Sequence, residues 1–286
     1  MTLLDRVLTC HAWDAARYRP FLIDGVRYGR IDADFAARLA DYPELFEAAA
    51  VRLRPALDDP ATRTQAVAEA MAQFRLKGDL PYWRGELYPV TNEWGRTPVM
   101  AVERGAVARF GMRAYGIHLN GLVRTDDGVC VWVAKRAASR KVAPGRWDQM
   151  VAGGQPAGLS VRENVTKECA EEAGVPAALA ETAQPVGALS YLCEQPDGLR
   201  DDVAFCFDLW LPEDFVPENR DGEVERFELW PLERALAVVR ETDAFKFNCA
   251  LVVIDLALRY GAISPDEPGY AEIRTALGRQ TPASEP

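Results

Sequence analysis

One segment, residues 151–176 (VAGGQPAGLSVRENVTKECAEEAGVP), constrains the fold of this chain more than any other. Ser160 can act as the N-cap of a helix with Glu163 three residues later, which is the reciprocal pairing of a capping box. Gly174 suits the left-handed residue that follows a helix end, and Pro176 discourages continuation of the helix. The segment therefore predicts a glycine turn followed by a short helix that ends just before Gly174.

The predicted helix carries three glutamates at i, i+3 and i+4, namely Glu168, Glu171 and Glu172. This spacing puts their carboxylates on one face, where like charges repel one another and cost helix stability. A divalent cation would relieve the repulsion, and Mg²⁺ prefers carboxylate oxygens and commonly bridges to substrate phosphates. An ordinary solvated acidic face explains the spacing equally well, so both interpretations stay open on spacing alone.

The whole string resembles the Nudix box, which reads Gly, five residues, Glu, seven residues, Arg-Glu, apolar, any, Glu-Glu, any, Gly, apolar. Aligned on Gly174, the first glycine is Gly153 and the three helical glutamates match. Leu159 replaces the first Glu of the pattern, and Lys167 replaces the Arg. In the family, the helical glutamates bind the metal, whereas the first Glu and the Arg support the turn. The resemblance implies these metal ligands: Glu168, Glu171, Glu172 and the backbone carbonyl of Gly153.

Segments outside the box are similar to one Nudix subgroup, whose members carry an extra N-terminal DUF4743 domain. They are WRGELYPV, YGIHLNGLV, the PG-x-W-D loop and FKFNCALVVIDLALRYG, so the similarity runs from about Phe21 to Leu277. The subgroup includes fungal and plant proteins related to thiamine pyrophosphokinase, whose Nudix part removes phosphate from oxidised, damaged thiamine diphosphate. The resemblance implies a DUF4743-like domain over residues 1–112 and a Nudix hydrolase domain over residues 113–286.

The pattern of the second half indicates a mixed sheet with helices on two sides. YGIHLNGLV and VCVWVAKR flank a turn at residues 125–128 and predict a hairpin, and DVAFCFDLWL, apolar on both faces, predicts a central strand. Two helices are expected over residues 231–242 and 248–260, and SRKVAPGRWDQ is expected to be a loop. The fold class is α/β (α+β), and the Nudix resemblance implies an α/β/α sandwich.

The first half reads as a small mixed α+β unit. FLIDGVRYGRI predicts two strands that turn at Asp24-Gly25. Helices are expected over residues 35–57, with a break at Pro43, and over residues 62–76. Short strands are expected in LPYWRGELYPVT and TPVMAVERGAVARFG, and the chain closes on a polar tail over residues 281–286.

The resemblance implies attack of water on a phosphorus atom of a diphosphate linkage, with the glutamates and Mg²⁺ (Mn²⁺ as a second choice) neutralising charge on the phosphate oxygens. Glu172 is our first choice of general base and Glu171 the second, while a later loop offers Glu223 or Glu225. For Glu223 and Glu225 the alternative is a solvated entry to a strand.

Several other side chains are candidates for substrate binding. Cations near the hairpin end and before the last helix could grip phosphate, and an aromatic and charged cluster at the domain junction could stack on a heterocycle. The candidates are Arg136, Lys141, Lys246, Trp83, Arg84, Tyr88 and Asn120. Ordinary surface charge, interdomain packing and structural hydrogen bonding are the competing explanations. His118, on the same strand face as Asn120, is a weaker candidate.

The composition and net charge exclude some classes of binding partner for this chain. The 286 residues are 49% hydrophobic and 27% charged, which is typical of a soluble globular protein. A net charge of −10 argues against a nucleic acid or an anionic membrane as the main partner. Six cysteines without CxxC spacing favour buried free thiols, and the N-terminal residues lack the pattern of a signal peptide. We expect a cytoplasmic monomer or homodimer that acts on a small diphosphate.

The sequence analysis therefore predicts a Mg²⁺-dependent Nudix diphosphatase, with thiamine diphosphate or its oxidised forms as the first choice of substrate. ADP-ribose, another nucleoside diphosphate derivative or an isoprenoid diphosphate is the alternative substrate. A non-catalytic binding module is a second class, motivated by the departures at Leu159 and Lys167. An isopentenyl diphosphate isomerase ranks lower, because Cys130 and Cys193 have no clear partner.

Overall fold

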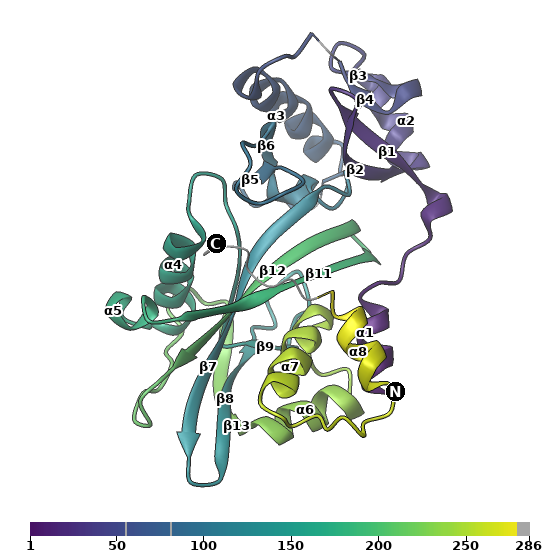
Figure 1. The fold of residues 1–286 in the computed structure, drawn as a ribbon. Helices are drawn as coiled ribbons and strands as arrows, with labels where there is room; N and C mark the ends of the chain where they lie inside the picture. The colour runs from purple at the N-terminus through teal and green to yellow at the C-terminus, as the bar shows by residue number, and fades with distance from the viewer. Residues whose placement is uncertain (55, 81, 279–286) are drawn as a thin grey trace.

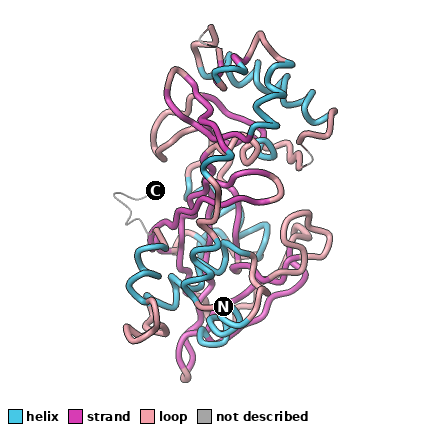
Figure 2. The backbone as a smooth tube through the Cα atoms, turned by 90° about the vertical axis from the view of Figure 1, so that its right-hand side faces the viewer, coloured by secondary structure: helices cyan, strands magenta, loops and turns pink. Residues whose placement is uncertain are grey.

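The computed structural model describes residues 1–54, 56–80 and 82–278, so the expected polar tail at 281–286 lies outside the described residues. A small N-terminal unit lies at one end of a larger unit that is built around a long, twisted sheet (Figure 1). The view from the side shows the same stacking of the two units (Figure 2). The mixed α+β class and the separate N-terminal unit are thereby confirmed.

The N-terminal unit contains a four-stranded sheet in the order β2-β1-β4-β3 and a separate two-stranded sheet. The predicted strand pair is confirmed, since β1 and β2 are antiparallel and turn at Asp24-Gly25. Its strands are β1 (Tyr18–Ile23), β2 (Val26–Asp32), β3 (Phe46–Glu47), β4 (Arg52–Leu53), β5 (Leu87–Val90) and β6 (Met100–Glu103). Its helices are α2 (Ala33–Arg38) and α3 (Pro60–Leu76), with single 3-10 turns at Ala15–Arg17, Leu39–Asp41, Ala48–Ala50 and Arg104–Ala106.

The prediction of a helix over residues 35–57 is wrong beyond Asp41, because the short strands β3 and β4 and a single 3-10 turn follow instead. Val51 has a left-handed backbone (φ 51°), which no helix tolerates and which is rare for a β-branched residue. Phe46 and Leu53 are buried in the core of this unit. Burial of these side chains in a small sheet therefore outweighs the local helical preference.

The larger unit has a seven-stranded sheet with the path β11-β12-β7-β8-β13, and β10 and β9 pair with β7 and β8 beside it. Only the β12–β7 pair is parallel among these strands, so the sheet is mixed as predicted. The predicted central strand, β12, lies inside the sheet between β11 and β7. The strands are β7 (Arg113–Thr125), β8 (Gly128–Arg136), β9 (Trp147–Gln149), β10 (Val151–Gly154), β11 (Gln184–Gln195), β12 (Gly198–Trp210) and β13 (Val224–Pro231).

The hairpin of β7 and β8 opens into a fork, and this fork positions the glycine turn. The two strands pair with each other over residues 121–125 and 128–132, and beyond that point β10 pairs with β7 and β9 pairs with β8. The end of the expected loop is therefore a strand, contrary to prediction. Trp147 anchors it, because its ring is buried and packs edge-on against Trp230 with centroids 4.7 Å apart.

Helices cover both faces of the large sheet (Figure 1). On one face lie α4 (Val161–Ala173) and α5 (Ala177–Ala180), and on the other lie α1 (Leu3–Thr9), α6 (Leu232–Glu241), α7 (Phe247–Arg259) and α8 (Tyr270–Ala276). The predicted capping box of α4 is present, and Gly174 ends the helix with φ 63°. Within the described residues, no helix has the length and apolar character to cross a bilayer.

Candidate active site

A polar cleft of about 160 Å³ lies where the N-terminal unit meets β7, β10 and β12. Both units line it, and its described lining residues carry more cations than carboxylates. The cations are Arg84, Arg104, Arg136, Arg140, Arg200 and Lys246, and the carboxylates are Asp197, Asp202 and Glu223. In a protein of net charge −10, such a concentration of positive charge indicates a site for an anion.

Two glutamates of α4 pack against the glycine turn, whose residues Ala152 and Gly153 line this cleft. Glu172 accepts a hydrogen bond from the Ala152 backbone N–H at 2.8 Å. The carboxyl carbon of Glu168 lies 2.3 Å from the position that a Cβ on Gly153 would occupy, so any side chain at position 153 would displace this carboxyl group. Both glutamates are buried, and burial raises the pKa of each carboxyl group.

Three carboxylates come together next to this turn, and sequence reasoning identified only two of them. Glu172, Asp221 and Glu223 each offer an oxygen, and these oxygens lie within 4.8 Å of one another. Asp221 precedes β13 in the same DGE loop as Glu223, and this short spacing was the signal that could have revealed it. An all-oxygen set of this kind suits a hard divalent cation. Arg140 forms an ion pair with Glu223 at 2.5 Å.

Glu171 takes a different position from its two neighbours. Its side chain is about half exposed, and its carboxylate binds Lys167 Nζ at 2.8 Å. The same ammonium group lies 3.1 Å from Glu168. Lys167, which replaces the Arg of the Nudix box, thus bridges two of the three helical glutamates, and only Glu172 of the three belongs to the close acidic cluster.

The turn is held by side-chain amides although Leu159 replaces the supporting Glu. Gln155 is fully buried and donates from Nε2 to the Leu159 carbonyl at 2.8 Å. Asn164, also fully buried, donates from Nδ2 to the Gly154 carbonyl at 2.9 Å. These bonds satisfy backbone carbonyls of the turn from both sides, so the loss of the family Glu does not leave the turn unsupported.

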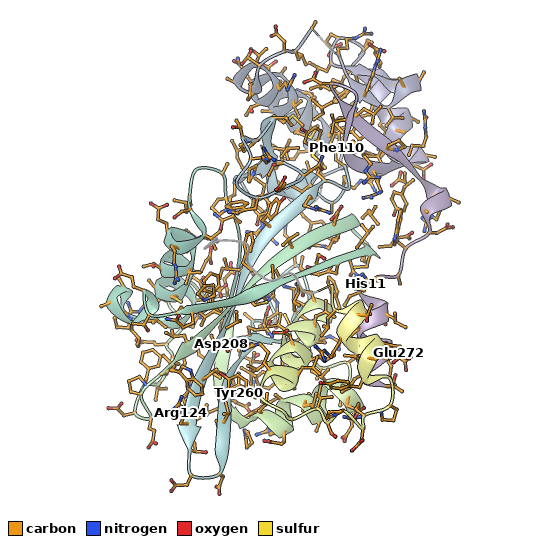
Figure 3. The ribbon with its side chains drawn as sticks, viewed as in Figure 1. His11, Phe110, Arg124, Asp208, Tyr260 and Glu272 are labelled. Carbon is orange, nitrogen blue, oxygen red and sulfur yellow. The ribbon has the colours of Figure 1, made fainter. Side chains whose placement is uncertain are left out.

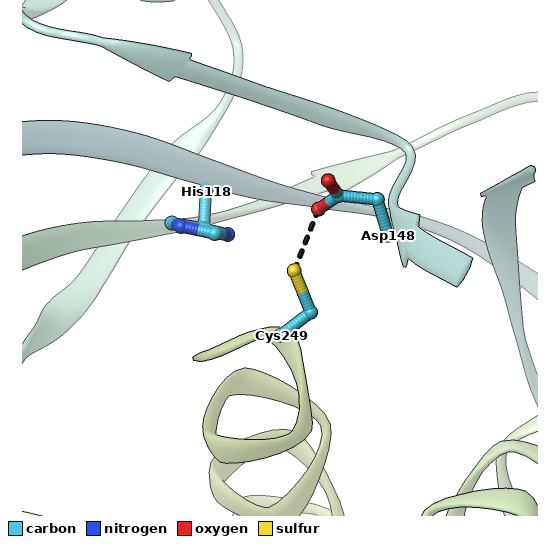
Figure 4. A group of neighbouring side chains, drawn as sticks. All are labelled: His118, Asp148 and Cys249. Atoms are coloured by element: carbon cyan, nitrogen blue, oxygen red, sulfur yellow. Dashed lines mark hydrogen bonds between the residues drawn. The ribbon is translucent and has the colours of Figure 1, made fainter. Parts of the chain in front are cut away.

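Two cations of the cleft share one buried anchor, Asp148 on β9. Arg136 binds its carboxylate at 2.9 Å and Lys246 approaches it at 3.7 Å. Cys249 donates from Sγ to the other carboxylate oxygen at 2.7 Å (Figure 4). Burial alone would raise the pKa of Asp148, but the two cations outweigh it and lower the pKa to about 2. Asp148 is therefore ionised and holds both cations beside the cleft.

His118 lines the cleft and is uncharged at neutral pH. Its Nδ1 lies 2.8 Å from Gln149 Oε1, and burial lowers its pKa to about 4. Together with Asp148 and Cys249 it forms a compact group whose ligand atoms lie within 4.8 Å (Figure 4). Because Asp148 already neutralises two cations, this group is a poor site for a metal ion and acts as a structural support.

The N-terminal unit packs directly on the glycine turn. Tyr88 is buried, and its hydroxyl oxygen lies 1.3 Å from where a Cβ on Gly154 would sit. Arg104 lies over the Tyr88 ring, 5.3 Å from its centroid, and pairs with Glu86 at 2.9 Å. Arg84 also lines the cleft. The predicted candidates Tyr88, Arg84, Arg136 and Lys246 thus meet in one place with Glu223 and Gly153.

Three other predicted binding residues are not among the described residues that line this cleft. Trp83 packs at the edge of the N-terminal core, with Arg75 over its ring. Asn120 is buried and donates to Asp208 at 2.9 Å, and Asp208, which is labelled in Figure 3, also binds Arg259. Lys141 lines a neighbouring cavity instead.

That neighbouring cavity has a volume of about 400 Å³ and adjoins the cleft. The two share five lining residues, Tyr82, Val142, Asp197, Arg200 and Lys246. Much of its wall is apolar and includes Val239, Phe245, Phe247 and Ala250. A molecule with an anionic end and an apolar or aromatic end could therefore occupy both spaces.

Comparison with known proteins gives the family. Residues 2–114 match the family described as domain of unknown function (DUF4743), and residues 115–249 match the NUDIX domain. Over 262 residues the chain is 42% identical to Nudix hydrolase 24, chloroplastic, of Arabidopsis thaliana, with 90% of this chain and 72% of that protein covered. The chain belongs to the Nudix hydrolase family. The predicted resemblance and the predicted enzyme class, a hydrolase, are thereby confirmed.

The comparisons also found another plant relative and solved structures of lower similarity. Nudix hydrolase 20, chloroplastic, of Arabidopsis thaliana is 40% identical over 269 residues, with 90% of this chain and 72% of that protein covered. Among solved structures, DR0079 from Deinococcus radiodurans has a TM-score of 0.47 and 20% identity, covering 59% of this chain and 98% of that chain. Nudix hydrolases generally use divalent metal ions, and the acidic cluster of this Nudix chain provides a matching set of oxygen ligands.

Proposed function

We propose that this Nudix hydrolase is a Mg²⁺-dependent diphosphatase of a small phosphorylated metabolite, with thiamine diphosphate or its oxidised forms as substrate. One observation carries the proposal: the Glu172–Asp221–Glu223 cluster lies beside a cleft lined by six cations. A metal-bound diphosphate requires carboxylates that bind the metal ion and cationic side chains that bind the phosphate oxygens.

The metal would be held by Glu172, Asp221 and Glu223, with Glu168 and the Gly153 carbonyl beside them and Glu171 at the solvent side. Three carboxylates within 4.8 Å repel one another, and burial already raises the pKa of Glu172, so the donor set fits a hard dication. When bound, Mg²⁺ (or Mn²⁺) supplies charge neutralisation and a more acidic water.

The side chains of the chain perform the remaining tasks. Arg136 and Lys246, fixed by Asp148, bind phosphate oxygens, and arginine can do so with two parallel hydrogen bonds. Glu172 is our first choice of general base, because a raised pKa brings a carboxyl group closer to the pH at which it works. Glu223 is the next choice, because it lines the cleft, whereas Glu171 is bound to Lys167.

The adjoining cavity supports an organic group on the diphosphate. Phe245 and Phe247 give it aromatic walls on which a heterocycle can stack, while its carboxylates, Asp197 and Asp243, are paired with Arg200 and Arg6. The aromatic walls agree with the thiazole ring of thiamine diphosphate or its oxidised form. ADP-ribose or another nucleoside diphosphate derivative remains the alternative substrate, since a purine also stacks on aromatic rings.

The test is phosphate release with Mg²⁺ over thiamine diphosphate, oxidised thiamine diphosphate, ADP-ribose and other nucleoside diphosphate derivatives. The Glu171→Gln/Glu172→Gln variant should lose turnover by at least about 10²-fold, the scale of losing charge stabilisation in a transition state, with its melting temperature maintained. Glu225→Gln, at an exposed position near the start of β13, is the matched control and should turn over normally. Unchanged turnover in the double variant would remove the mechanism, and a nucleotide preference would remove the thiamine assignment.

A second candidate function is a binding module that has lost turnover. The Lys167 bridge favours it, because an ammonium group that already neutralises Glu168 and Glu171 competes with a metal ion for them. Ligand-induced stabilisation by a diphosphate, with no hydrolysis anywhere in the panel, would favour this candidate. Restoration of hydrolysis by Lys167→Arg would show that the departure from the Nudix box is the cause.

A further inference from the structure

We propose that the DUF4743 domain forms part of the active site and that its residue Arg84 binds a phosphate group of the substrate. The inference rests on the proposed function, because it assigns one end of the same diphosphate to a side chain outside the Nudix domain. It gives the N-terminal domain a chemical task in addition to packing.

The turn that carries Arg84 is built around a buried carboxylate. Glu103 has only 4% of its surface exposed. Its Oε1 accepts the backbone N–H groups of Arg84 at 2.6 Å and Gly105 at 3.2 Å, and its Oε2 accepts that of Gly85 at 3.1 Å. A buried carboxylate is costly unless it is hydrogen-bonded, and here the bonds fix the backbone of one turn. Glu103 therefore sets the direction in which the Arg84 side chain leaves the backbone.

The guanidinium of Arg84 differs from its neighbours in the cleft. Arg104, Arg136 and Arg140 each form an ion pair with a carboxylate. Arg84 has no ion pair with any carboxylate in the part of the chain that the structure describes. Arg84 is exposed; partial burial of its guanidinium and the positive charges of Arg104 and Arg140 lower its pKa, whereas the negative charge of Glu223 raises it. A cation that lies among other cations and forms no direct ion pair with a described carboxylate is suited to an anion supplied by the ligand.

The N-terminal domain also contacts the Nudix glycine turn and the residues after it directly. The Leu87 carbonyl, three residues after Arg84, accepts the Ala157 N–H at 2.8 Å. Tyr88 packs its hydroxyl against Gly154, where no side chain larger than hydrogen fits. These contacts lie next to the residues that precede α4. Arg84 and Glu223, a member of the acidic cluster, line the same cleft, so a diphosphate bound there lies near both domains.

The experiment measures the affinity of the full chain for inorganic pyrophosphate by titration calorimetry in metal-free buffer with EDTA. Arg84→Gln should weaken binding by at least about tenfold, which is the scale of one charged hydrogen bond. Arg84→Lys keeps the charge but not the planar fork, so its loss should be smaller. Arg96→Gln is the control, since Arg96 is an exposed arginine of the same domain that pairs only with Glu93 among the described residues.

Equal affinities of the wild-type, Arg84→Gln and Arg96→Gln chains would overturn the inference, as would a wild-type chain that does not bind pyrophosphate. Glu103→Gln tests the positioning separately and should weaken binding in the same direction, with Arg84 still present. The result is independent of turnover. Arg84-dependent binding without hydrolysis of any diphosphate would contradict the proposed function and leave this inference intact. Binding and hydrolysis that do not change in the Arg84→Gln variant would contradict this inference and leave the proposed function intact.

Discussion

His118 is buried and neutral beside an ionised aspartate and two cations. Its pKa is lowered to about 4 by burial first and by the Lys246 charge next. The unfolded chain therefore takes up the histidine proton near its ordinary pKa of 6.5, while the folded chain resists protonation until about pH 4. The contribution of this residue to the free energy of unfolding is constant above the unfolded pKa and falls as the pH drops through this window.

We predict that the free energy of unfolding of the wild-type chain falls by about 2 kcal/mol more than that of His118→Gln between about pH 7 and about pH 5. Glutamine keeps a hydrogen-bonding group next to Gln149 but does not titrate. Urea unfolding at the two pH values measures the difference. Parallel losses in both chains would show that His118 is not held neutral by the fold.

At the scale of single elements, β9 is short but carries Asp148, on which two cations of the cleft depend. We predict that Asp148→Asn lowers the free energy of unfolding by about 3 kcal/mol, because removal of one partner leaves buried positive charge uncompensated. The same variant should raise KM for a diphosphate more than it lowers kcat, since Arg136 and Lys246 lose their anchor. Denaturant unfolding and steady-state kinetics check both effects.

Glu225→Gln provides the comparison for Asp148→Asn, because it breaks an ion pair with Arg226 in which both side chains are about half exposed. An exposed pair contributes about 0–1 kcal/mol, so the two losses should differ clearly. Equal losses would mean that the charges around β9 are better solvated than the structure indicates.

Individual elements also show which structural features can be predicted from the sequence alone. The capping pattern of α4 predicts its bounds because helix caps are local, and the glycine turn of the Nudix box lies against the helical glutamates, with Gly153 beside Glu168 and Ala152 bonded to Glu172. Asp221 was missed because its loop meets α4 only in three dimensions. The helix expected over residues 35–57 is wrong beyond Asp41 for a related reason, because Phe46 is buried in a core built from residues far apart in the sequence.

At the scale of the whole molecule, the two domains meet at a glycine. We predict that Gly154→Ala lowers the melting temperature and the turnover together, because its Cβ would collide with the Tyr88 hydroxyl and push the domains apart. Tyr88→Leu should relieve part of the collision, so the double variant should be more stable than the sum of the two single losses, with an interaction energy of about 1 kcal/mol or more. Thermal unfolding of the four chains measures this cycle.

Additive losses in the cycle would show that the two side chains do not meet. Gly158→Ala is a suitable control for crowding, since no atom lies within 4 Å of where its Cβ would be, although its left-handed backbone (φ 90°) carries its own strain. The control should lower stability without any dependence on Tyr88.

The first helix of the chain, α1, packs against α7 and α8, with Leu3 and Val7 in the same core as residues near the other end of the sequence. During synthesis, α1 can bury its apolar side chains only after α7 and α8, near the end of the chain, have been made. A fragment that starts at residue 113 would expose the surface that α1 covers, so it should aggregate even though it contains every residue of the NUDIX match.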